Sequence, residues 1–309
     1  MIVLLNRQAN NSRGLRKWEE IRGELEDRFL GRDYRVIFDA RDLEENLRQE
    51  TAAVGHTVIA AGGDGTVNFL VNQLMKLEER DRRQIVFGAI GLGSSNDFHK
   101  PFSDDRRLNG RVHVKLDKRR ARAHNVGQVD FIDTEGKRRS KFFIINASVG
   151  IIAKANLLFN SGGRLINWLK PRCVLGAIYY AAIKTILTAQ NIPAVVAVDG
   201  ERCRTEITTL SILISPHFSG NLSYDLDVSP QSDYLGIALA ERMGIGERLR
   251  ALASLARSKF AGLPKTRIWR GRSVEIQTGS PVALETDGEV CLASDIRVRL
   301  LQGYMRVCQ

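Results

Sequence analysis

The first 121 residues alternate short apolar runs with longer stretches of helical spacing. The runs predict strands, and the stretches predict amphipathic helices because their apolar positions recur every three or four residues. This alternation is typical of an α/β domain. Strands are expected at 2–5, 34–38, 56–61 and 85–90, and helices at 13–29, 41–53 and 67–82.

After residue 121 the pattern changes to strand-like pieces. They predict a second, mostly antiparallel β domain over residues 122–295, with a helix near 246–262. The expected strands lie at 142–147, 194–198, 210–215, 235–240, 274–277 and 282–284.

The segment Gly62-Gly63-Asp64-Gly65-Thr66 follows an apolar run and opens a helical stretch. A strand that ends in glycines and passes into a helix can bind phosphate, because the first N–H groups of the helix have no partner within it. A carboxylate beside a polyphosphate needs a bridging cation such as Mg²⁺ or a role in positioning the phosphoryl group. Asp64 therefore favours phosphoryl transfer, with an ordinary helix N-cap as the alternative.

A second loop of small polar residues, Gly91 to Asp97, follows the next apolar run. Ends of neighbouring parallel strands meet at one edge of a sheet, so both loops are expected to share one ligand. Ser94 and Ser95 can donate to phosphate oxygens. Asp97 is either a second carboxylate near the metal or the cap of the next helix.

A third element, Glu285-Thr286-Asp287-Gly288-Glu289, lies near the end of the chain. Asp-Gly between alternating apolar residues predicts a type I′ hairpin, whose two central residues need positive φ. Glu289 would be held at the exit of this tight turn, which is a suitable place for a general base.

These three elements, in this order, resemble the diacylglycerol kinase catalytic family, which includes bacterial lipid kinases and sphingosine kinases. The resemblance extends through Thr66-Val67-Asn68 and Asn72, through Ser94 to Phe98, and to Asp287-Gly288-Glu289. It also includes the opening strand, which leads from Asn6 into a polar loop that reaches Gly14.

The resemblance implies an ATP- and Mg²⁺-dependent kinase that phosphorylates a lipid hydroxyl, for example of diacylglycerol. It also implies a two-domain fold with a β-sandwich as the second domain and an interdomain cleft. Residues 296–309 would return to the first domain and complete it with residues 1–121. The implied nucleotide-binding residues are Asn6, Arg7, Gln8, Ala9, Asn10, Gly62, Gly63, Asp64, Gly65, Thr66, Val67, Asn68, Ser94, Ser95 and Asn96.

By the same resemblance, Glu289 takes the proton of the acceptor hydroxyl, and Asp64 with Asp97 holds Mg²⁺. A second, structural Mg²⁺ loop is implied, with the side chain of Asp233 and the backbone carbonyls of Pro230 and Leu235 as ligands. Tyr234 stands in this loop where the family usually has glycine, so a plain surface turn is the alternative.

The chain departs from the family pattern at several positions. Asn125 occupies the place of an aspartate in many members, and Ile152 or Lys154 replaces an acidic residue. Phe69 replaces a glutamate, and Arg7 stands where proline is usual. These changes leave open a catalytically degenerate lipid- or nucleotide-binding protein. The cationic Lys154 disfavours the ammonium group of sphingosine, because like charges repel.

The net charge of +11 adds an expectation about partners. Basic residues cluster at 106–122 and 137–141, which favours peripheral contact with an anionic membrane or a solvated surface. The sequence has no recognisable nucleic-acid-binding module, so no nucleic acid is expected.

The remaining features concern location and anchoring. Four cysteines without C-x-x-C spacing, and no recognisable secretory signal, favour a cytoplasmic protein. A homodimer is left open. The apolar stretch 174–183 is too short to span a membrane. The segment 165–172 either faces the core or rests in a membrane interface with Trp168 at the level of the headgroups.

An NAD kinase-like enzyme is the alternative function, because that group also uses the Gly-Gly-Asp-Gly-Thr sequence. The loop Ser94 to Asp97 and the closing Asp287-Gly288-Glu289 favour a lipid kinase instead.

Overall fold

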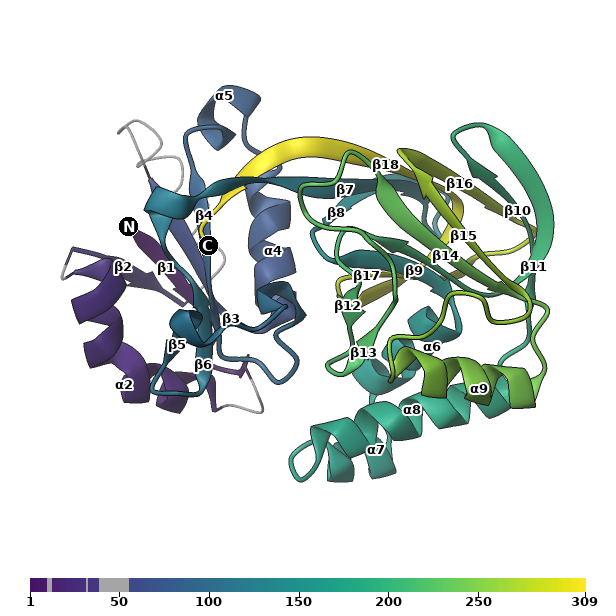
Figure 1. Cartoon of the computed structure of the whole chain (residues 1–309), viewed down its shortest axis with the longest axis horizontal. Coiled ribbons are helices and arrows are strands. Elements are labelled where there is room, and N and C mark those ends of the chain that lie inside the picture. The colour runs from purple at the N-terminus through teal and green to yellow at the C-terminus, as the bar shows by residue number, and fades with distance from the viewer. Residues whose placement is uncertain (10–12, 32, 39–55) are drawn as a thin grey trace. The chain divides into compact units, whose positions relative to one another are not determined.

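The computed structural model describes residues 1–9, 13–31, 33–38 and 56–309 (Figure 1). They form two compact units: unit 1 is Met1–Asn125 with Gly303–Gln309, and unit 2 is Val126–Gln302. The sequence analysis placed the corresponding boundaries at 121 and 296. The predicted helix 41–53 and the predicted nucleotide-binding residue Asn10 lie outside the described residues.

Unit 1 is built on a parallel sheet. Its strands run in the order β4-β3-β1-β2, and the last residues of the chain pair in parallel with β4. Gly62 of β3 is in register with Gly91 of β4, so the two glycine loops begin at the same level of the sheet. The strands are β1 (Ile2–Leu5), β2 (Arg35–Ile37), β3 (Thr57–Gly62), β4 (Val86–Gly91), β5 (Arg107–Leu108) and β6 (Val112–Lys115).

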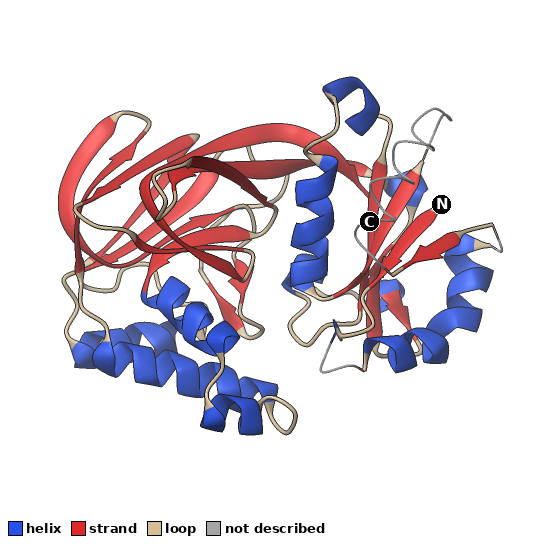
Figure 2. Ribbon diagram, turned by 180° about the vertical axis from the view of Figure 1, so that it is seen from behind, coloured by secondary structure: helices blue, strands red, loops and turns tan. Residues whose placement is uncertain are grey.

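Two helices, α2 (Gly14–Leu25) and α4 (Asp64–Leu74), cover opposite faces of this sheet (Figures 1 and 2). Trp18 and Ile21 of α2 pack in one core with Ile59 of β3. A wider turn of π type, Glu26–Leu30, continues α2. Short 3₁₀ turns follow at Asp97–His99, Asp104–Arg106 and Lys118–Arg120.

The predicted helix 67–82 differs from the structure. It starts earlier, at Asp64, and is divided into α4 and α5 (Glu79–Arg82). The acidic residues Glu79 and Asp81 lie in the first turn of α5. Acidic side chains are favourable at a helix N-terminus and unfavourable at a C-terminus, so this cluster favours a new helix over a longer one.

Unit 2 is a layered antiparallel β domain, as the sequence predicted. Its strands pair in the order β15-β14-β11-β10-β16-β18, and β9 and β17 join β11 to β18. Val149, Val196, Leu210 and Ile276 belong to its main core. The strands are β7 (Arg122–Ile132), β8 (Arg138–Phe143), β9 (Asn146–Gly150), β10 (Ile192–Val198), β11 (Glu201–Leu213), β12 (His217–Phe218), β13 (Leu222–Ser223), β14 (Leu235–Glu241), β15 (Thr266–Gly271), β16 (Ser273–Thr278), β17 (Val282–Thr286) and β18 (Glu289–Val307).

One predicted strand of unit 2 is wrong. The run 142–147 is divided between β8 and β9, with a bend at Ile144 and Ile145. The backbone N–H groups of Ile144, Ile145 and Asn146 all donate to the carboxylate of Asp287. These N–H groups point to one side chain instead of a neighbouring strand, so the run does not continue as one strand.

Four helices pack on unit 2: α6 (Ile151–Ser161), α7 (Arg164–Leu169), α8 (Val174–Thr188) and α9 (Ile245–Leu255). α8 contacts the other three (Figure 1). α9 ends before the predicted residue 262, ahead of Ser258, whose positive φ of 52° breaks the helical conformation. In the part of the chain that the structure describes, no helix has the length and apolarity needed to cross a membrane.

Candidate active site

The loops that follow β1 and β3 are joined by a side-chain hydrogen bond. Asn6 Nδ2 donates to Thr66 Oγ1 at 3.0 Å, and the backbone N–H of Asn6 donates to the carbonyl of Ala61 at 2.9 Å. Asn6 Oδ1 in turn accepts from the backbone N–H of Gln8. Arg7 is exposed, and its guanidinium lies 3.7 Å from the ring centre of Phe38. The described part of the predicted first loop thus lies beside the start of α4.

Glycines bring the β3 and β4 loops into contact. A Cβ atom on Gly93 would lie 2.4 Å from the Cα of Gly63, and one on Gly62 would lie 2.2 Å from Thr66 Oγ1 within the β3 loop itself. Because such distances are not tolerated, only glycine allows this approach. The two loops predicted to share one ligand are therefore adjacent in unit 1.

Asp64 links these two loops. It is the first residue of α4, whose N-cap is Gly63, so the alternative of a plain N-cap for its own helix is not what the structure has. Its Oδ1 instead accepts the backbone N–H of Phe98 at 3.0 Å. Further along α4, Asn68 is buried, and its side-chain and backbone oxygens accept from Asn72 Nδ2.

The loop after β4 is shaped by Asn96, which adopts a left-handed φ of 52°. Asn96 Nδ2 donates to the carbonyls of Gly91 and Gly93. Ser94 is exposed and Ser95 is half-buried. Asp97 is buried and forms an ion pair with Lys100 at 2.7 Å.

The donors in unit 1 fit a Mg²⁺ ion bound together with phosphates. Mg²⁺ in phosphoryl-transfer sites is held by one or two carboxylates plus substrate phosphates, so a cluster of three acidic residues is not needed. Asp64 is half-buried at the start of α4, where phosphate is expected. The described residues contain no cluster of three metal-binding side chains, and Asp97 is already ion-paired. Asp64 is thus the better-placed carboxylate.

Lys17 is a cation at this edge that the sequence analysis missed. Its Nζ donates to the carbonyls of Leu92 and Gly93 at 3.2 and 3.3 Å. Burial lowers the pKa of Lys17, and the nearby Arg13 adds to this effect. No sequence signal sets Lys17 apart, because it is one of several basic residues in an amphipathic helix.

In unit 2, the predicted hairpin is confirmed. Thr286 of β17 pairs with Glu289 of β18, and the two residues between them, Asp287 and Gly288, have φ of 47° and 91°. Asp287 is buried, and its carboxylate accepts the three N–H bonds of the β8–β9 bend at 2.7 to 2.9 Å. Glu289, the predicted proton acceptor, is exposed directly after the turn. The turn that presents Glu289 is therefore fixed by a buried carboxylate.

Glu285 is a second buried carboxylate of this hairpin. Its Oε2 accepts from Ser148 Oγ at 2.6 Å and Asn146 Nδ2 at 3.2 Å, and its Oε1 accepts from the N–H of Gly288. Burial raises the pKa of Glu285 to about 7, although the Ser148 and Gly288 hydrogen bonds oppose this. The sequence analysis assigned it no role. The sequence signal that could have identified Glu285 is a carboxylate within an apolar strand, two residues before the carboxylate of Asp287.

Asn125 also has a defined structural role. Its Oδ1 accepts the N–H of Gly303 at 2.9 Å, and the residue is buried. It thus joins β7 to the part of β18 that belongs to unit 1. Glu289 lies in unit 2, whereas Asp64 and Asp97 lie in unit 1. Their assembly around one ion in an interdomain cleft stays a prediction.

An arginine from the turn between β15 and β16 lies beside the predicted structural Mg²⁺ loop. Arg272 Nε donates to the backbone carbonyl of Asp233 at 2.9 Å, and Arg272 Nη2 lies 3.8 Å from the Asp233 carboxylate. A guanidinium thus supplies positive charge where the metal would. The Mg²⁺ ligand set of Pro230, Asp233 and Leu235 stays a prediction.

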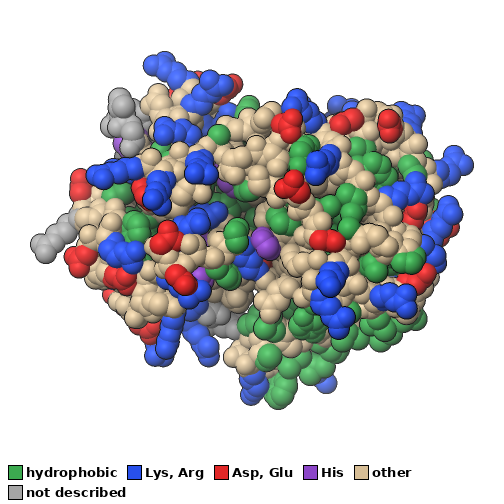
Figure 3. Space-filling model, in the orientation of Figure 1, with side chains coloured by type: hydrophobic (Ala, Val, Ile, Leu, Met, Phe, Trp, Pro, Cys, Tyr) green, Lys and Arg blue, Asp and Glu red, His purple; other side chains and the backbone are tan. Residues whose placement is uncertain are grey.

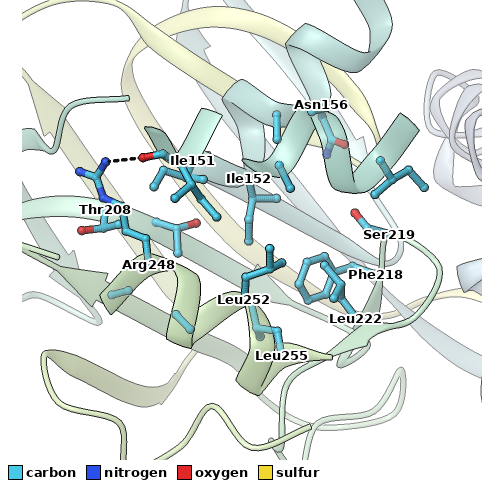
Figure 4. Close-up of a pocket in the computed structure, with 18 of the residues that line it drawn as sticks. Ile151, Ile152, Asn156, Thr208, Phe218, Ser219, Leu222, Arg248, Leu252 and Leu255 are labelled. Carbon is cyan, nitrogen blue, oxygen red and sulfur yellow. Dashed lines mark hydrogen bonds between the residues drawn. The ribbon is translucent and has the colours of Figure 1, made fainter. Parts of the chain in front are cut away.

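Unit 2 also contains an apolar pocket between α6, α8, α9 and the sheet (Figure 4). Its empty space, including the part open to solvent, is about 740 Å³. Arg248 and Thr208 lie at one end, and Asn156 and Ser219 lie at the other. Most of the wall is aliphatic or aromatic, with Ile152, Ile178, Ala182, Phe218, Leu252 and Leu255 among its residues.

Arg248 holds the helices around this pocket together. Its guanidinium donates to the carbonyls of Ile186 and Ala189 at the C-terminal end of α8, and to Met243 and Asn191. These contacts tie α9 to α8. The guanidinium is thus bound to the protein's own carbonyls.

Helix α6 connects the pocket to the hairpin. Ile152, Asn156 and Phe159 of α6 line the pocket. The next residue, Asn160, donates from Nδ2 to the carbonyl of Gly288 at 2.8 Å. One helix therefore contacts both the apolar pocket and the turn that carries Glu289.

Comparisons with known proteins agree with this architecture. The model of the "Diacylglycerol kinase catalytic domain" matches residues 1–129, and that of the "YegS C-terminal NAD kinase beta sandwich-like domain" matches residues 148–309. Diacylglycerol kinase of Staphylococcus carnosus is 23% identical over 232 residues, which are 75% of this chain and 69% of that protein. Diacylglycerol kinase of Staphylococcus haemolyticus is 22% identical over 251 residues, which are 81% of this chain and 70% of that protein.

Among solved structures, a diacylglycerol kinase from Bacillus anthracis has the same fold. The TM-score is 0.68 at 18% identity, over 99% of this chain and 95% of that one. The predicted fold class, an α/β domain followed by an antiparallel β-sandwich domain, is confirmed. The chain therefore belongs to the diacylglycerol kinase catalytic family and has a second domain of the YegS type.

Proposed function

We propose that this protein is an ATP-dependent lipid kinase that transfers the γ-phosphoryl group to a hydroxyl of a lipid such as diacylglycerol. The observation that supports this most is the double contact of α6. It lines an apolar pocket through Ile152 and Phe159, and it binds the Glu289 hairpin through Asn160. A lipid with its acyl chain in such a pocket would bring its polar end toward a carboxylate.

Different residues would bind the nucleotide, accept the proton and hold the metal ion during phosphoryl transfer. Backbone N–H groups of the first turn of α4, with Ser94, would bind the phosphates of ATP. Glu289 would accept the proton of the attacking hydroxyl. Asp64 would hold Mg²⁺, which neutralises charge on the phosphates when bound. Glu285 and Asp287 are positioning residues, because they hold the turn and do not face solvent themselves.

The acceptor is expected to be a lipid without a cationic headgroup. Lys154 lies half-buried in α6, the helix that carries pocket residues Ile152 and Asn156. Its positive charge would repel the ammonium group of an amino alcohol. The apolar wall has no polar pattern that could select one acyl chain over another except by length.

The test is phosphate transfer from [γ-³²P]ATP to mixed-lipid vesicles that contain diacylglycerol and sphingosine, with NAD present in solution. We compare wild type with Glu289→Gln and Asp64→Asn, and use Glu201→Gln as the control because Glu201 is an exposed glutamate of β11 in unit 2. We expect lipid-bound label that falls at least about 100-fold in both site variants, as for a lost general base, and is unchanged in the control.

Other outcomes would contradict the proposal. Label found only in water-soluble NADP would indicate an NAD kinase-like enzyme. No labelled product with any acceptor would indicate a binding protein without catalysis. Preferential phosphorylation of sphingosine would contradict the acceptor class.

A second variant tests the pocket. Ala182→Phe places a large ring on α8 at the pocket wall. We expect activity with long-chain diacylglycerol to fall and activity with short-chain diacylglycerol to be retained. An equal loss of activity with both chain lengths would indicate that the pocket does not bind the acyl chain of the acceptor.

A further inference from the structure

The helices of unit 2 present large apolar side chains that the described chain does not cover. Trp168 and Leu187 are each 54% exposed. In Figure 3 hydrophobic side chains gather along the edge of unit 2 formed by α7, α8 and α9. We call this surface the apolar helix face. It consists of Leu157, Leu165, Trp168, Leu175, Ile183, Leu187, Ile245 and Leu249.

α8 shows that this face is separate from the core. Ile183 and Leu187 are four residues apart and lie on one exposed stripe. Ile178 and Ala182 of the same helix line the pocket. α8 therefore has two apolar sides, one toward the pocket and one toward the outside.

The charge that α6, α7 and α8 bring to this face is positive only. The sequence has no aspartate or glutamate from residue 136 to residue 198, which includes α6, α7 and α8. Arg172 lies 4.7 Å from the ring centre of Trp168 and donates to its carbonyl. On α9, Glu247 is paired with Lys265 at 2.8 Å. The cations at the face are Arg164, Lys170, Arg172 and Lys184.

We infer that the apolar helix face docks onto the surface of an anionic lipid bilayer. Tryptophan and leucine side chains enter the interface between headgroups and acyl chains, where aromatic residues are enriched in membrane proteins. The cations around them contact lipid phosphates. The inference depends on the proposed function for its purpose, because the same helices line the pocket proposed for the acyl chain.

A second copy of the chain fits this face less well. Pairing two such faces would bring Arg164, Lys170, Arg172 and Lys184 of both copies together, with no acidic residue of α6, α7 or α8 to balance them. Like charges at an interface are unfavourable. An anionic bilayer satisfies both the apolar and the charged side chains.

The basic clusters that the sequence analysis assigned to membrane contact are less suitable. Arg139 is paired with Asp133 at 2.8 Å, and Arg107 is paired with Asp104 at 3.1 Å. Part of their charge is therefore balanced within the protein. On α6, α7 and α8 no acidic residue is present to do this.

The test is vesicle flotation of the full chain without ATP. Vesicles of phosphatidylcholine are compared with vesicles that contain about one third phosphatidylglycerol. The test variants are Leu165→Ser with Trp168→Ser, and Arg164→Glu with Arg172→Glu. The matched controls are Leu292→Ser, an exposed apolar residue of β18, and Arg119→Glu with Arg120→Glu from a basic cluster.

We expect binding to the anionic vesicles only, with a blue shift of tryptophan fluorescence that is lost in the variant without Trp168. Both test variants should bind at least about tenfold more weakly, and both controls should bind like wild type. If the apolar variant fails to fold, the charge variant decides the question. Unchanged vesicle binding in a folded test variant would overturn the inference. The inference would also be overturned if wild type is a dimer and the apolar variant is a monomer.

Phosphate transfer to a short-chain, monomeric diacylglycerol separates the two proposals. The docking variants should retain it, because they lie outside the pocket and the hairpin. If wild type does not phosphorylate this lipid, the proposed function is contradicted. The flotation result would still decide whether the apolar helix face binds membranes.

Discussion

The two units differ in how their helices cover the sheet and in the groups at their candidate ligand sites. In unit 1, Trp18 and Ile21 of α2 are buried against the sheet, and neutral groups such as Asn6 and Thr66 form the ligand edge. In unit 2, charged groups are buried, as Glu285 and Asp287 are, while apolar side chains of α6 to α9 lie outside. Under the proposed function, this difference would suit unit 1 to a phosphate ligand and unit 2 to a lipid.

The largest expected effect comes from removing the buried carboxylate of the hairpin. Asp287→Ala leaves the N–H groups of Ile144, Ile145 and Asn146 without their acceptor. Each unsatisfied buried group costs about 1–3 kcal/mol, so we expect unit 2 to lose about 4 kcal/mol of stability by denaturant unfolding. Asp287→Asn keeps one acceptor oxygen and should lose less. Equal losses would show that the carboxylate geometry is not needed.

The next effect is the pH dependence of unit 2. The pKa of Glu285 rises to about 7 on folding, because burial disfavours its charged form. The folded state therefore keeps a proton that the unfolded state has lost, and stability falls as pH rises from about 4.5 to about 7. From pH 5 to pH 8 wild type should lose about 3 kcal/mol more than Glu285→Gln. A wild-type curve parallel to that of the variant would contradict this.

Unit 1 should respond to pH in the opposite direction. Burial, with Lys115 nearby, lowers the pKa of His99 to about 3. Below the ordinary value of 6.5 the unfolded state gains a proton that the folded state does not, so stability falls as pH falls. From pH 6.5 to pH 5 wild type should lose about 2 kcal/mol more than His99→Leu. The fluorescence of Trp18 reports on this unit. A stability difference between wild type and His99→Leu that does not change with pH would contradict the lowered pKa of His99.

The contact between the two glycine loops gives a smaller effect. Gly93→Ala places a Cβ 2.4 Å from the Cα of Gly63. Such overpacking should cost about 2 kcal/mol of unfolding free energy. Gly23→Ala is the control, because nothing lies within 4 Å of its Cβ and it is in the interior of α2. We expect the control to gain about 1 kcal/mol. A Gly93→Ala variant as stable as wild type would show that the loops can separate.

The smallest effect concerns the loop with Asp233. If Arg272 supplies the positive charge at this loop, Mg²⁺ can bind there only when the Arg272 side chain is removed. Arg272→Ala should then be stabilised by about 1 kcal/mol when Mg²⁺ is in tenfold excess over its Kd, and Arg272→Ala with Asp233→Asn should not. If Mg²⁺ stabilises wild type and Asp233→Asn abolishes this stabilisation, the result would support the predicted metal loop instead.

Local sequence patterns predicted the elements whose causes are local. The apolar runs gave β3 and β4, and Asp287-Gly288 gave the hairpin, because positive φ is a property of those two residues. The division of 142–147 could not be predicted in this way. Its cause, the Asp287 carboxylate, is more than 140 residues away in the sequence.

The helices of unit 2 show a second reason for incomplete prediction. α7 spans only Arg164–Leu169, which is too short for a periodic pattern to reveal its buried side. Ile166 is buried while Trp168 is exposed, so the segment faces the core with one side only, and its contact with a membrane interface stays a prediction. Lys17 was missed because its partners are backbone carbonyls of another element, and these leave no sequence signal.

The hydrogen bonds of Arg248 have a consequence for selectivity. Four of them go to Met243, Ile186, Ala189 and Asn191. A guanidinium committed to the ends of two helices offers little attraction to a phosphate or carboxylate that enters beside it. Under the proposed function, discrimination between acceptors with different headgroups would come from residues outside this cavity, and the cavity would select only by the length of the acyl chain.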